Sequence, residues 1–174
     1  MKVYKRQQNE FFVIAHNIRS LFNVGAIFRT ADAFAVSKIF LTGYTPTLDN
    51  VKHKIKINKT ALGAEEFVLW EYNNSAIKAI KNLRLKYKKL KVVALENNLG
   101  PGFKMSTKLN RFKCADPIAL VLGEEVGGVD KKILKSCDKI VEIPMYGKKE
   151  SLNVSVAFGV AAYVISQNLK NVLK

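Results

Sequence analysis

Short apolar runs recur along the chain and alternate with longer segments whose apolar residues stand three or four positions apart. A continuous apolar run that ends at a glycine, a proline or a charged residue is typical of a strand buried on both faces of a parallel sheet. Runs of this kind predict six strands, at residues 11–15, 38–42, 66–72, 91–96, 117–122 and 139–143.

Helical spacing marks the segments between these runs. Residues 20–35 place apolar side chains at Leu21, Val24, Ile27, Phe28, Ala31 and Phe34, which is the pattern of a helix with one buried face. Residues 75–86 repeat the pattern behind Ser75, a residue type that caps helices. A long apolar helix is expected to begin near Ser151 and to end near Leu169.

Residues 44–63 are expected to form a loop, because Pro46, Asp49 and Asn50 favour turns and a run of lysines follows them. Buried strands that alternate with helices predict an α/β fold, a mostly parallel sheet flanked by helices on both faces. No repeat, low-complexity tract or linker interrupts the pattern. We therefore expect residues 1–174 to form a single domain.

Charge is the strongest deviation in the composition. The chain has 29 Lys and Arg against 14 Asp and Glu, a formal net charge of +15. Three interpretations stay open: a nucleic-acid partner, a surface whose lysines serve only solubility, and binding to an anionic membrane surface. In the first, Lys52, Lys54 and Lys56 would grip RNA.

Other classes are disfavoured. Two cysteines, two histidines and the absence of a CxxC pair argue against a metal site. The polar, basic start of the chain, residues 1–10, has no secretory signal, and the longest apolar run, residues 156–165, is shorter than the ~18 residues of a membrane-spanning helix. A cytoplasmic location with reduced thiols is expected.

Three loops that follow predicted strands are the candidate site, at residues 17–25, 123–130 and 144–151, because ligands bind at the carboxyl ends of strands in open α/β sheets. The second loop lacks GxGxxG and GK[ST] spacing, and Glu124 and Glu125 would repel a pyrophosphate. A neutral or cationic ligand therefore suits it better. A general acid/base role for the two carboxylates is disfavoured, because adjacent side chains point apart.

Nucleophilic catalysis is also disfavoured. Ser151 and Ser155 lack a GxSxG context, and neither His16 nor His53 carries the signature of a partner base. Cys114 precedes an ordinary turn into a strand. Ser151 and Asn153 instead stand at a helix start, where unpaired N–H groups are available to a ligand.

Residues 17–34, 120–129 and 143–157 closely resemble the three motifs of the SpoU/TrmH family of RNA 2′-O-methyltransferases, part of the SPOUT superfamily. The resemblance covers nearly the whole chain, with the motifs in the right order and spacing. It implies an α/β sheet whose carboxyl-terminal segment threads a loop to form a deep trefoil knot, a rare feature that periodicity does not reveal.

The resemblance also implies a cofactor and a set of site residues. S-adenosyl-L-methionine would lie in the knot, held largely by backbone around Leu95, Gly123, Ile143, Met145 and Leu152. Apolar side chains would sandwich its adenine while amides and carbonyls read the edge. The family's polar site residues match Asn23, Arg29, Glu125, Ser151 and Asn153.

Arg29 is the group that, in the family, is described as activating the ribose hydroxyl. Since a guanidinium holds its proton firmly, we expect Arg29 to bind the adjacent phosphate and to stabilise the developing alkoxide. Asn23 would orient Arg29 or the ribose, or cap its helix. Ser151 and Asn153 have the same capping alternative, and Glu125 would fix its loop by accepting backbone N–H bonds.

The chain has few residues before the first predicted strand, and no tail after the last helix. Target recognition is therefore expected from residues 52–59, from Lys148 and Lys149 and from a second protomer, with tRNA favoured over rRNA. The long helix has apolar residues around most of its circumference, which favours a homodimer. The rival interpretation is a non-catalytic RNA-binding module, and an enzyme of a small acidic metabolite is disfavoured.

Overall fold

The computed structural model describes residues 10–97, 99 and 106–171. The polar start of the chain and most of the loop expected after residue 96 lie outside this part. Its helices and strands are β1 (Phe11–His16), α1 (Leu21–Ala33), β2 (Lys38–Thr42), α2 (Val51–Ala61), the 3₁₀ helix η1 (Ala64–Glu66), β3 (Trp70–Asn73), α3 (Ala76–Lys86), β4 (Lys91–Leu95), β5 (Thr107–Lys108), the 3₁₀ helix η2 (Leu109–Arg111), β6 (Ile118–Leu122), α4 (Lys131–Leu134), β7 (Lys139–Glu142) and α5 (Val154–Asn171).

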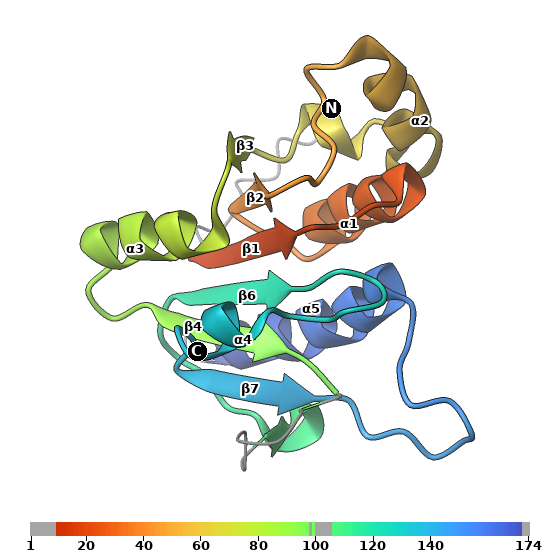
Figure 1. Cartoon of the computed structure of the whole chain (residues 1–174). Coiled ribbons are helices and arrows are strands. Elements are labelled where there is room, and N and C mark those ends of the chain that lie inside the picture. Colours follow the sequence, from red (N-terminus) through yellow and green to blue (C-terminus); the bar gives the residue numbers. More distant parts are fainter. Residues whose placement is uncertain (1–9, 98, 100–105, 172–174) are drawn as a thin grey trace.

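The strands form one seven-stranded sheet in the order β3-β2-β1-β6-β4-β7-β5. Every paired neighbour runs parallel. The predicted parallel α/β sheet is therefore confirmed. β2 and β3 follow β1 outward on one side of the sheet. On the other side β6 lies between β1 and β4, and β7 lies between β4 and the edge strand β5 (Figure 1).

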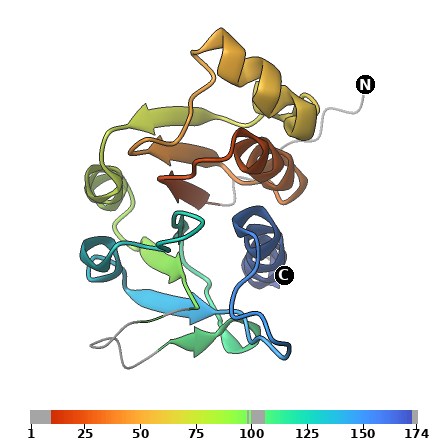
Figure 2. The same ribbon diagram turned by 45° about the vertical axis from the view of Figure 1, so that its right-hand side comes forward.

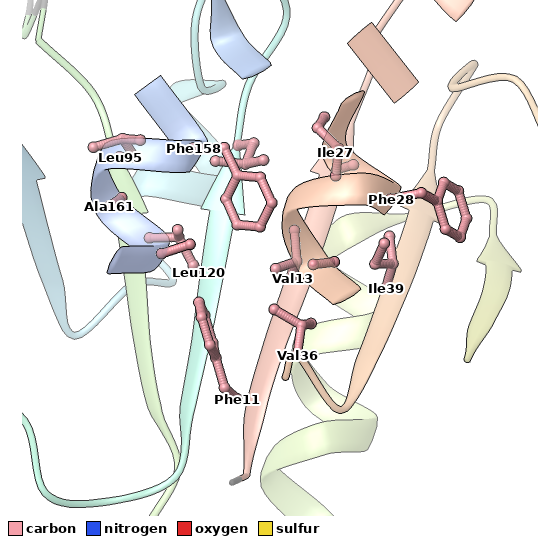
Figure 3. Close-up of a cluster of buried hydrophobic side chains, with 14 of the residues drawn as sticks. Phe11, Val13, Ile27, Phe28, Val36, Ile39, Leu95, Leu120, Phe158 and Ala161 are labelled. Carbon is pink, nitrogen blue, oxygen red and sulfur yellow. The ribbon is translucent and has the colours of Figure 1, made fainter. Parts of the chain in front are cut away.

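Helices cover both faces of the sheet, as Figure 2 shows, with α1 and α5 on one side and α3 and α4 on the other. Side chains of β1 alternate between two cores: Phe11, Val13 and Ala15 belong to the core under α1 and α5, and Phe12 and Ile14 to the core under α3 and α4. In the first core, Phe158 of α5 lies between the sheet and α1, near Leu120 and Ile27 (Figure 3).

Several predicted elements are confirmed with small shifts. β2 has the predicted bounds, and Ser75 caps α3 by accepting a hydrogen bond from the Lys78 amide. The strands predicted at 91–96, 117–122 and 139–143 are each one residue shorter. The helix predicted at 20–35 spans Leu21–Ala33.

The predicted loop at residues 44–63 is wrong in its second half, which forms α2. Asn50 caps this helix by accepting a hydrogen bond from the His53 amide, and Ile57 and Ala61 are its buried residues. Gly25 of α1 permits the contact: a Cβ there would lie 2.2 Å from the carbonyl oxygen of Ile57. The sequence shows no clear helical pattern here, because only Ile57 and Ala61 of α2 are buried and lysines occupy many of the other positions.

Other boundaries also differ from expectation. The strand predicted at 66–72 begins later, at Trp70, because residues 64–66 form η1. The last helix begins at Val154 rather than near Ser151, because Asn153 turns its side chain to the Ser155 amide and the chain before it is not helical. The two-residue strand β5 and the four-residue helix α4 were too short to give a sequence signal.

The parallel arrangement brings the loops after β1, β4, β6 and β7 to one edge of the sheet. The long connection between β7 and α5 projects from this edge (Figure 1). Among the described helices, none has the length and apolar character that crossing a membrane requires. The described part of the chain also holds no group of three or more metal-ligating His, Cys, Asp or Glu side chains.

Candidate active site

A cleft opens at the carboxyl edge of the sheet, between the loops that follow β4, β6 and β7. The space between its walls, counted with the open mouth, is about 750 Å³. Its lining comes from all three loops and from the start of α5: Leu95, Glu96, Asn97, Leu122, Gly123, Glu124, Glu125, Val126, Gly127, Gly128, Ile143, Ser151, Leu152, Val154 and Ala157.

The loop after β6 folds back on itself through two glycines. The amide of Glu124 donates to the carbonyl of Gly128, and the amide of Gly128 to the carbonyl of Glu124, each at 3.0 Å. A Cβ at Gly123 would lie 2.2 Å from the Gly128 carbonyl carbon, and Gly128 has φ of +66°. Only glycine suits such positions. The backbone therefore forms the cleft wall directly.

Two polar residues after β4 hold the neighbouring loops in place. The Glu96 carboxylate accepts a hydrogen bond from the Val129 amide at 2.7 Å. Asn97 donates from Nδ2 to the Ile143 carbonyl at 2.7 Å and accepts from the Ile143 amide at 3.0 Å. These bonds fix the walls on both sides of the β4 loop. Sequence reasoning missed both residues, although polar side chains directly after a buried strand are a usable signal.

The lining suits a ligand with an apolar ring and polar edges. Leu95, Ile143, Leu152 and Ala157 supply apolar surface, and the glycine loop supplies backbone N–H and C=O groups. Four of the five residues predicted to bind the cofactor line the cleft: Leu95, Gly123, Ile143 and Leu152. Met145 is half-buried and is not among the lining residues. Val154 and Ala157, at the start of α5, were not predicted.

A cluster of polar side chains joins the three loops at the mouth of the cleft. Glu125 accepts hydrogen bonds from the Arg19 amide at 3.1 Å, the Ser20 amide at 3.1 Å and Nδ2 of Asn23 at 2.9 Å. Nδ2 of Asn153 donates to Oδ1 of Asn23 at 3.2 Å. The predicted acceptance of backbone N–H bonds by Glu125 is therefore present.

Glu125 is ionised in this setting. Partial burial by itself would raise the pKa of Glu125, but the hydrogen bonds from the Arg19 amide, Asn23 and the Ser20 amide outweigh burial, and the pKa lies below its ordinary value. An ionised carboxylate with N–H donors on both oxygens does not abstract a proton readily. Its chemical effect is to hold Asn23 in one orientation.

The hydrogen bonds at the amino-terminal ends of α1 and α5 show which of the predicted capping residues cap a helix. Ser20, not Asn23, caps α1, since its side chain accepts from the Asn23 amide. Asn153 does accept from the Ser155 amide, at 2.9 Å, so it orders the start of α5 while its Nδ2 reaches Asn23. Ser151 is exposed and lines the cleft.

Arg29 lies apart from this cluster. It is on α1, six residues after Asn23 and so about 9 Å further along the helix at 1.5 Å per residue, and its side chain is exposed. Within the described part of the chain, no hydrogen bond or ion pair engages its guanidinium. The structure thus brings Asn23, Glu125, Ser151 and Asn153 to one edge and leaves Arg29 facing solvent.

His16 does not line the cleft that Ser151 lines. His16 ends β1, where its Nδ1 lies 2.9 Å from the Thr42 hydroxyl and its Nε2 3.4 Å from the Asp130 carboxylate. It lines a separate cavity with Ser75, Lys131 and other residues. Burial holds the pKa of His16 below its ordinary value, although the hydrogen bond to Asp130 acts in the opposite sense.

The predicted RNA-binding lysines, Lys52, Lys54 and Lys56, are exposed on α2. Because helix positions four apart share a face, Lys52 and Lys56 lie on one side with Lys59, three residues further on. Lys54 points elsewhere. Because these residues form a helix and not a loop, Lys52, Lys56 and Lys59 make one basic face, and Lys54 is not part of it.

Comparison with known proteins gives consistent matches over nearly the whole chain. The sequence pattern of the SpoU rRNA Methylase family matches residues 10–163. The chain is 32% identical over 163 residues to the tRNA (guanosine(18)-2′-O)-methyltransferase of Aquifex aeolicus, with 93% of this chain and 71% of that protein covered. It is 31% identical over 151 residues to the 23S rRNA (guanosine-2′-O-)-methyltransferase RlmB of Nitrosomonas europaea, of which it covers 54%.

Solved structures agree in fold. The A. aeolicus TrmH/SpoU tRNA modifying enzyme aligns with a TM-score of 0.78 at 28% identity, covering 95% of this chain and 78% of that one. An AdoMet-bound rRNA methyltransferase from Sinorhizobium meliloti aligns with a TM-score of 0.80 at 24% identity, covering 95% of this chain and 59% of that one. At 24% identity, the similarity to the S. meliloti protein shows the fold alone.

Proposed function

The chain belongs to the SpoU rRNA Methylase family, and we infer that it is an S-adenosylmethionine-dependent RNA methyltransferase whose acceptor is a ribose 2′-hydroxyl. The observation that carries this inference is the position of the Asn23–Glu125–Asn153 cluster at the mouth of a cleft walled by backbone and apolar side chains. Relatives of this chain act on tRNA and on 23S rRNA, by their names.

The cleft residues fit the cofactor. Leu95, Ile143 and Leu152 provide apolar surface for an adenine ring, and the glycine loop at 123–128 lets backbone groups approach closely. When bound, S-adenosylmethionine supplies an electrophilic methyl group. The carboxyl ends of β4, β6 and β7 hold the site on rigid elements, which favours accurate positioning.

The polar cluster would position the ribose. Asn23 is held by Glu125 on one side and by Asn153 on the other, so its amide has one orientation. We assign Asn23 and Asn153 to orienting the acceptor, Ser151 to the cleft rim, and Arg29 to binding a phosphate and stabilising the developing alkoxide. The proton would pass to a phosphate oxygen or to water.

The homodimer is part of the proposal. Val156, Val160 and Tyr163 of α5 are 53%, 41% and 56% exposed and lie on one face of the helix by their spacing. Apolar stripes of this kind favour an interface. Because no hydrogen bond or ion pair engages the Arg29 guanidinium within the described residues, and because Arg29 stands about 9 Å beyond Asn23 along α1, we propose that it serves the site of the second subunit.

Three finer features complete the proposal. The segment after β7, which the Asn97 bonds hold against the β4 loop, would form the trefoil knot of this fold. The substrate would be tRNA rather than rRNA, gripped by Lys52, Lys54 and Lys56 of α2. We place this activity in the cytoplasm and in a single domain formed by residues 1–174.

Calorimetry and methyl transfer test the function directly. Titration with S-adenosylmethionine and with its demethylated product should show one site per chain with micromolar affinity, roughly −8 kcal/mol. The radiolabelled methyl group of S-adenosylmethionine should be incorporated into RNA. The label should stay in the RNA after methyl groups on the bases are removed, because the proposed acceptor is the ribose. A folded protein that binds neither ligand would refute the proposed methyltransferase activity. Retained RNA binding without transfer would favour the non-catalytic RNA-binding module.

A further inference from the structure

Three side chains form a closed network beside the cleft mouth: the exposed Arg19 from the loop after β1, the exposed Tyr44 from the loop after β2 and the half-buried Glu124 from the loop after β6. Nη2 of Arg19 lies 3.0 Å from Oε1 of Glu124, and its Nε donates to the Tyr44 hydroxyl at 3.3 Å. The Tyr44 hydroxyl donates to Oε2 of Glu124 at 2.6 Å. Each side chain therefore holds the other two.

The backbone around the network is also held. The amide of Arg19 donates to Glu125 at 3.1 Å, which is the carboxylate that orients Asn23. The amide of Tyr44 donates to Oδ1 of Asn17 at 3.2 Å. The position of the guanidinium relative to the Asn23–Glu125–Asn153 cluster is thus set through both its main chain and its side chain.

Ordinary surface ion pairs contribute little, because two flexible side chains must be ordered in water. Here the ordering serves a further purpose. Both Glu124 oxygens are engaged, one by Arg19 and one by Tyr44. Nη1 of Arg19, by contrast, has no hydrogen-bond partner among the described residues, and the Arg19 side chain is 66% exposed. Of the three groups in the network, the Arg19 guanidinium is therefore the one available to a ligand. It is a cation whose N–H donors lie in one plane and are held in a fixed position.

A planar fork of N–H donors matches the oxygens of a phosphate. The hydrogen bond to Tyr44 and the charge of Glu124 raise the pKa of Arg19 above its ordinary value, so the positive charge is permanent. An arginine that is ordered before binding loses less conformational entropy when it binds.

We propose that Arg19, held in place by Tyr44 and Glu124, binds a phosphodiester of the RNA chain at the mouth of the cleft and so positions the acceptor nucleotide. This contact rests on the proposed function, because its ligand is the RNA substrate. Tyr44 and Glu124 are positioning residues, which act on the RNA only through Arg19.

The test measures RNA affinity against salt in three variants. The probe is unfractionated tRNA, bound in the presence of S-adenosylhomocysteine. Arg19→Ala should weaken binding about tenfold and reduce the slope of log K against log [salt] by about 0.7 to 0.9, the value of one lost phosphate contact. Tyr44→Phe should weaken binding by two- to threefold with an unchanged slope, since the charge stays.

Arg84→Ala is the matched control. Arg84 also forms a surface ion pair of 3.0 Å, with Asp138, but it lies at the amino edge of the sheet, in the last turn of α3, and Asp138 directly precedes β7. Its loss removes the same charge and should leave the affinity for tRNA within about twofold. Cofactor affinity and the unfolding temperature, measured for every variant, show whether the loop and cleft stay intact.

The result that overturns the inference is an Arg19→Ala protein, with normal cofactor affinity, whose salt slope equals that of Arg84→Ala. A wild-type protein that binds no tRNA would overturn it as well. Failure of the proposed function looks different: no methyl group enters RNA, while the slopes of Arg19→Ala and Arg84→Ala still differ.

Discussion

At the scale of single residues, the Glu125 carboxylate joins the loops of the site. It accepts from the Arg19 and Ser20 amides of the first loop and from Asn23, which in turn accepts from Asn153 of the third loop. Because hydrogen bonds to an ionised acceptor are stronger than those between neutral groups, these bonds reinforce one arrangement of the loops. The family motifs predicted the residues, but not that they form one chain of bonds.

Arg29→Ala is expected to lower the rate of methyl transfer by about 10² to 10³-fold, because the guanidinium acts on charge that develops in the transition state. Cofactor affinity and unfolding temperature should stay close to those of the wild type, since Arg29 is exposed on α1. Single-turnover methyl transfer with saturating RNA measures the change.

Arg29→Lys separates charge from shape. An ammonium keeps the charge but lacks the planar fork, so this variant should recover only a small part of the rate. Turnover near the wild-type value in either variant would contradict the assigned role.

His16 gives a pH-dependent contribution to stability. Its pKa in the folded chain lies below the ordinary 6.5 because of burial, so the unfolded chain binds the proton more readily. Stability should therefore fall as pH drops through 6.5 and stop falling below the folded pKa. Urea unfolding at pH 7.5 and 5.5 measures this loss.

The comparison is with His16→Gln, which can still hydrogen-bond Thr42 and Asp130 but does not titrate. The free energy of unfolding should change less between the two pH values in this variant than in the wild type. Equal changes in both proteins would show that His16 does not contribute.

At the scale of elements, α2 shows how a charged run can hide a helix. Its buried residues are only Ile57 and Ala61, and its contact with α1 depends on the missing side chain of Gly25, since a Cβ there would meet Thr60 and Ile57. The Asn50 cap was visible in the sequence. The contact of α2 with Gly25 was not visible in the sequence, because it joins residues more than thirty positions apart.

The face of α2 that carries Lys52, Lys56 and Lys59 should contribute most to RNA binding. Charge reversal at Lys52 and Lys56 together should flatten the salt dependence of tRNA affinity by more than twice the effect of reversal at Lys54 alone, because the first two share a face and the third does not. Fluorescence anisotropy over a series of salt concentrations measures these slopes.

Reversal of Lys88 and Lys89 is the matched control, because both are exposed and follow α3 at the opposite edge of the sheet. Cofactor affinity should be unaffected in all of these variants. If the Lys52/Lys56 and Lys88/Lys89 variants have equal slopes, α2 does not contact the RNA.

At the scale of the whole molecule, α5 has two different faces. Phe158, Ala161, Ala162 and Ile165 are fully buried against the sheet and α1 (Figure 3). Val156, Val160 and Tyr163 face outward. Tyr163 also meets Phe34 at the end of α1, with ring centroids 6.2 Å apart, so the outward stripe of α5 continues toward the helix that carries Arg29.

A shared site predicts complementation between two inactive proteins. When Arg29→Ala and Asn153→Ala subunits exchange, half of the dimers are mixed, and each mixed dimer has one intact site, so about a quarter of wild-type activity should return. Neither variant alone should be active. The measurement is methyl transfer after verified subunit exchange.

Tyr163→Lys provides the control for the interface. A charge in the outward stripe should give a monomer in sedimentation without unfolding the chain, because Tyr163 is more than half exposed. A monomeric wild type would end the dimer proposal. A dimer whose mixed variants stay inactive would place Arg29 and Asn153 at the site of one chain.

The sequence by itself determined what local physical chemistry controls. Apolar runs such as residues 38–42 form strands because both faces are buried, and Ser75 starts α3 because its side chain satisfies a free amide. The resemblance to the SpoU/TrmH motifs predicted Asn23, Glu125 and Asn153 as site residues, and the expected parallel sheet indicated that the loops after its strands meet at one edge.

Only the tertiary structure decided which distant side chains meet. The Asn97 bonds to Ile143 and the Arg19–Tyr44–Glu124 network join segments whose pairing no local pattern encodes. The same holds for α2, whose place against Gly25 is set by packing rather than by propensity. Such contacts depend on the path of the whole chain, because closeness in space across a sheet is independent of separation in sequence.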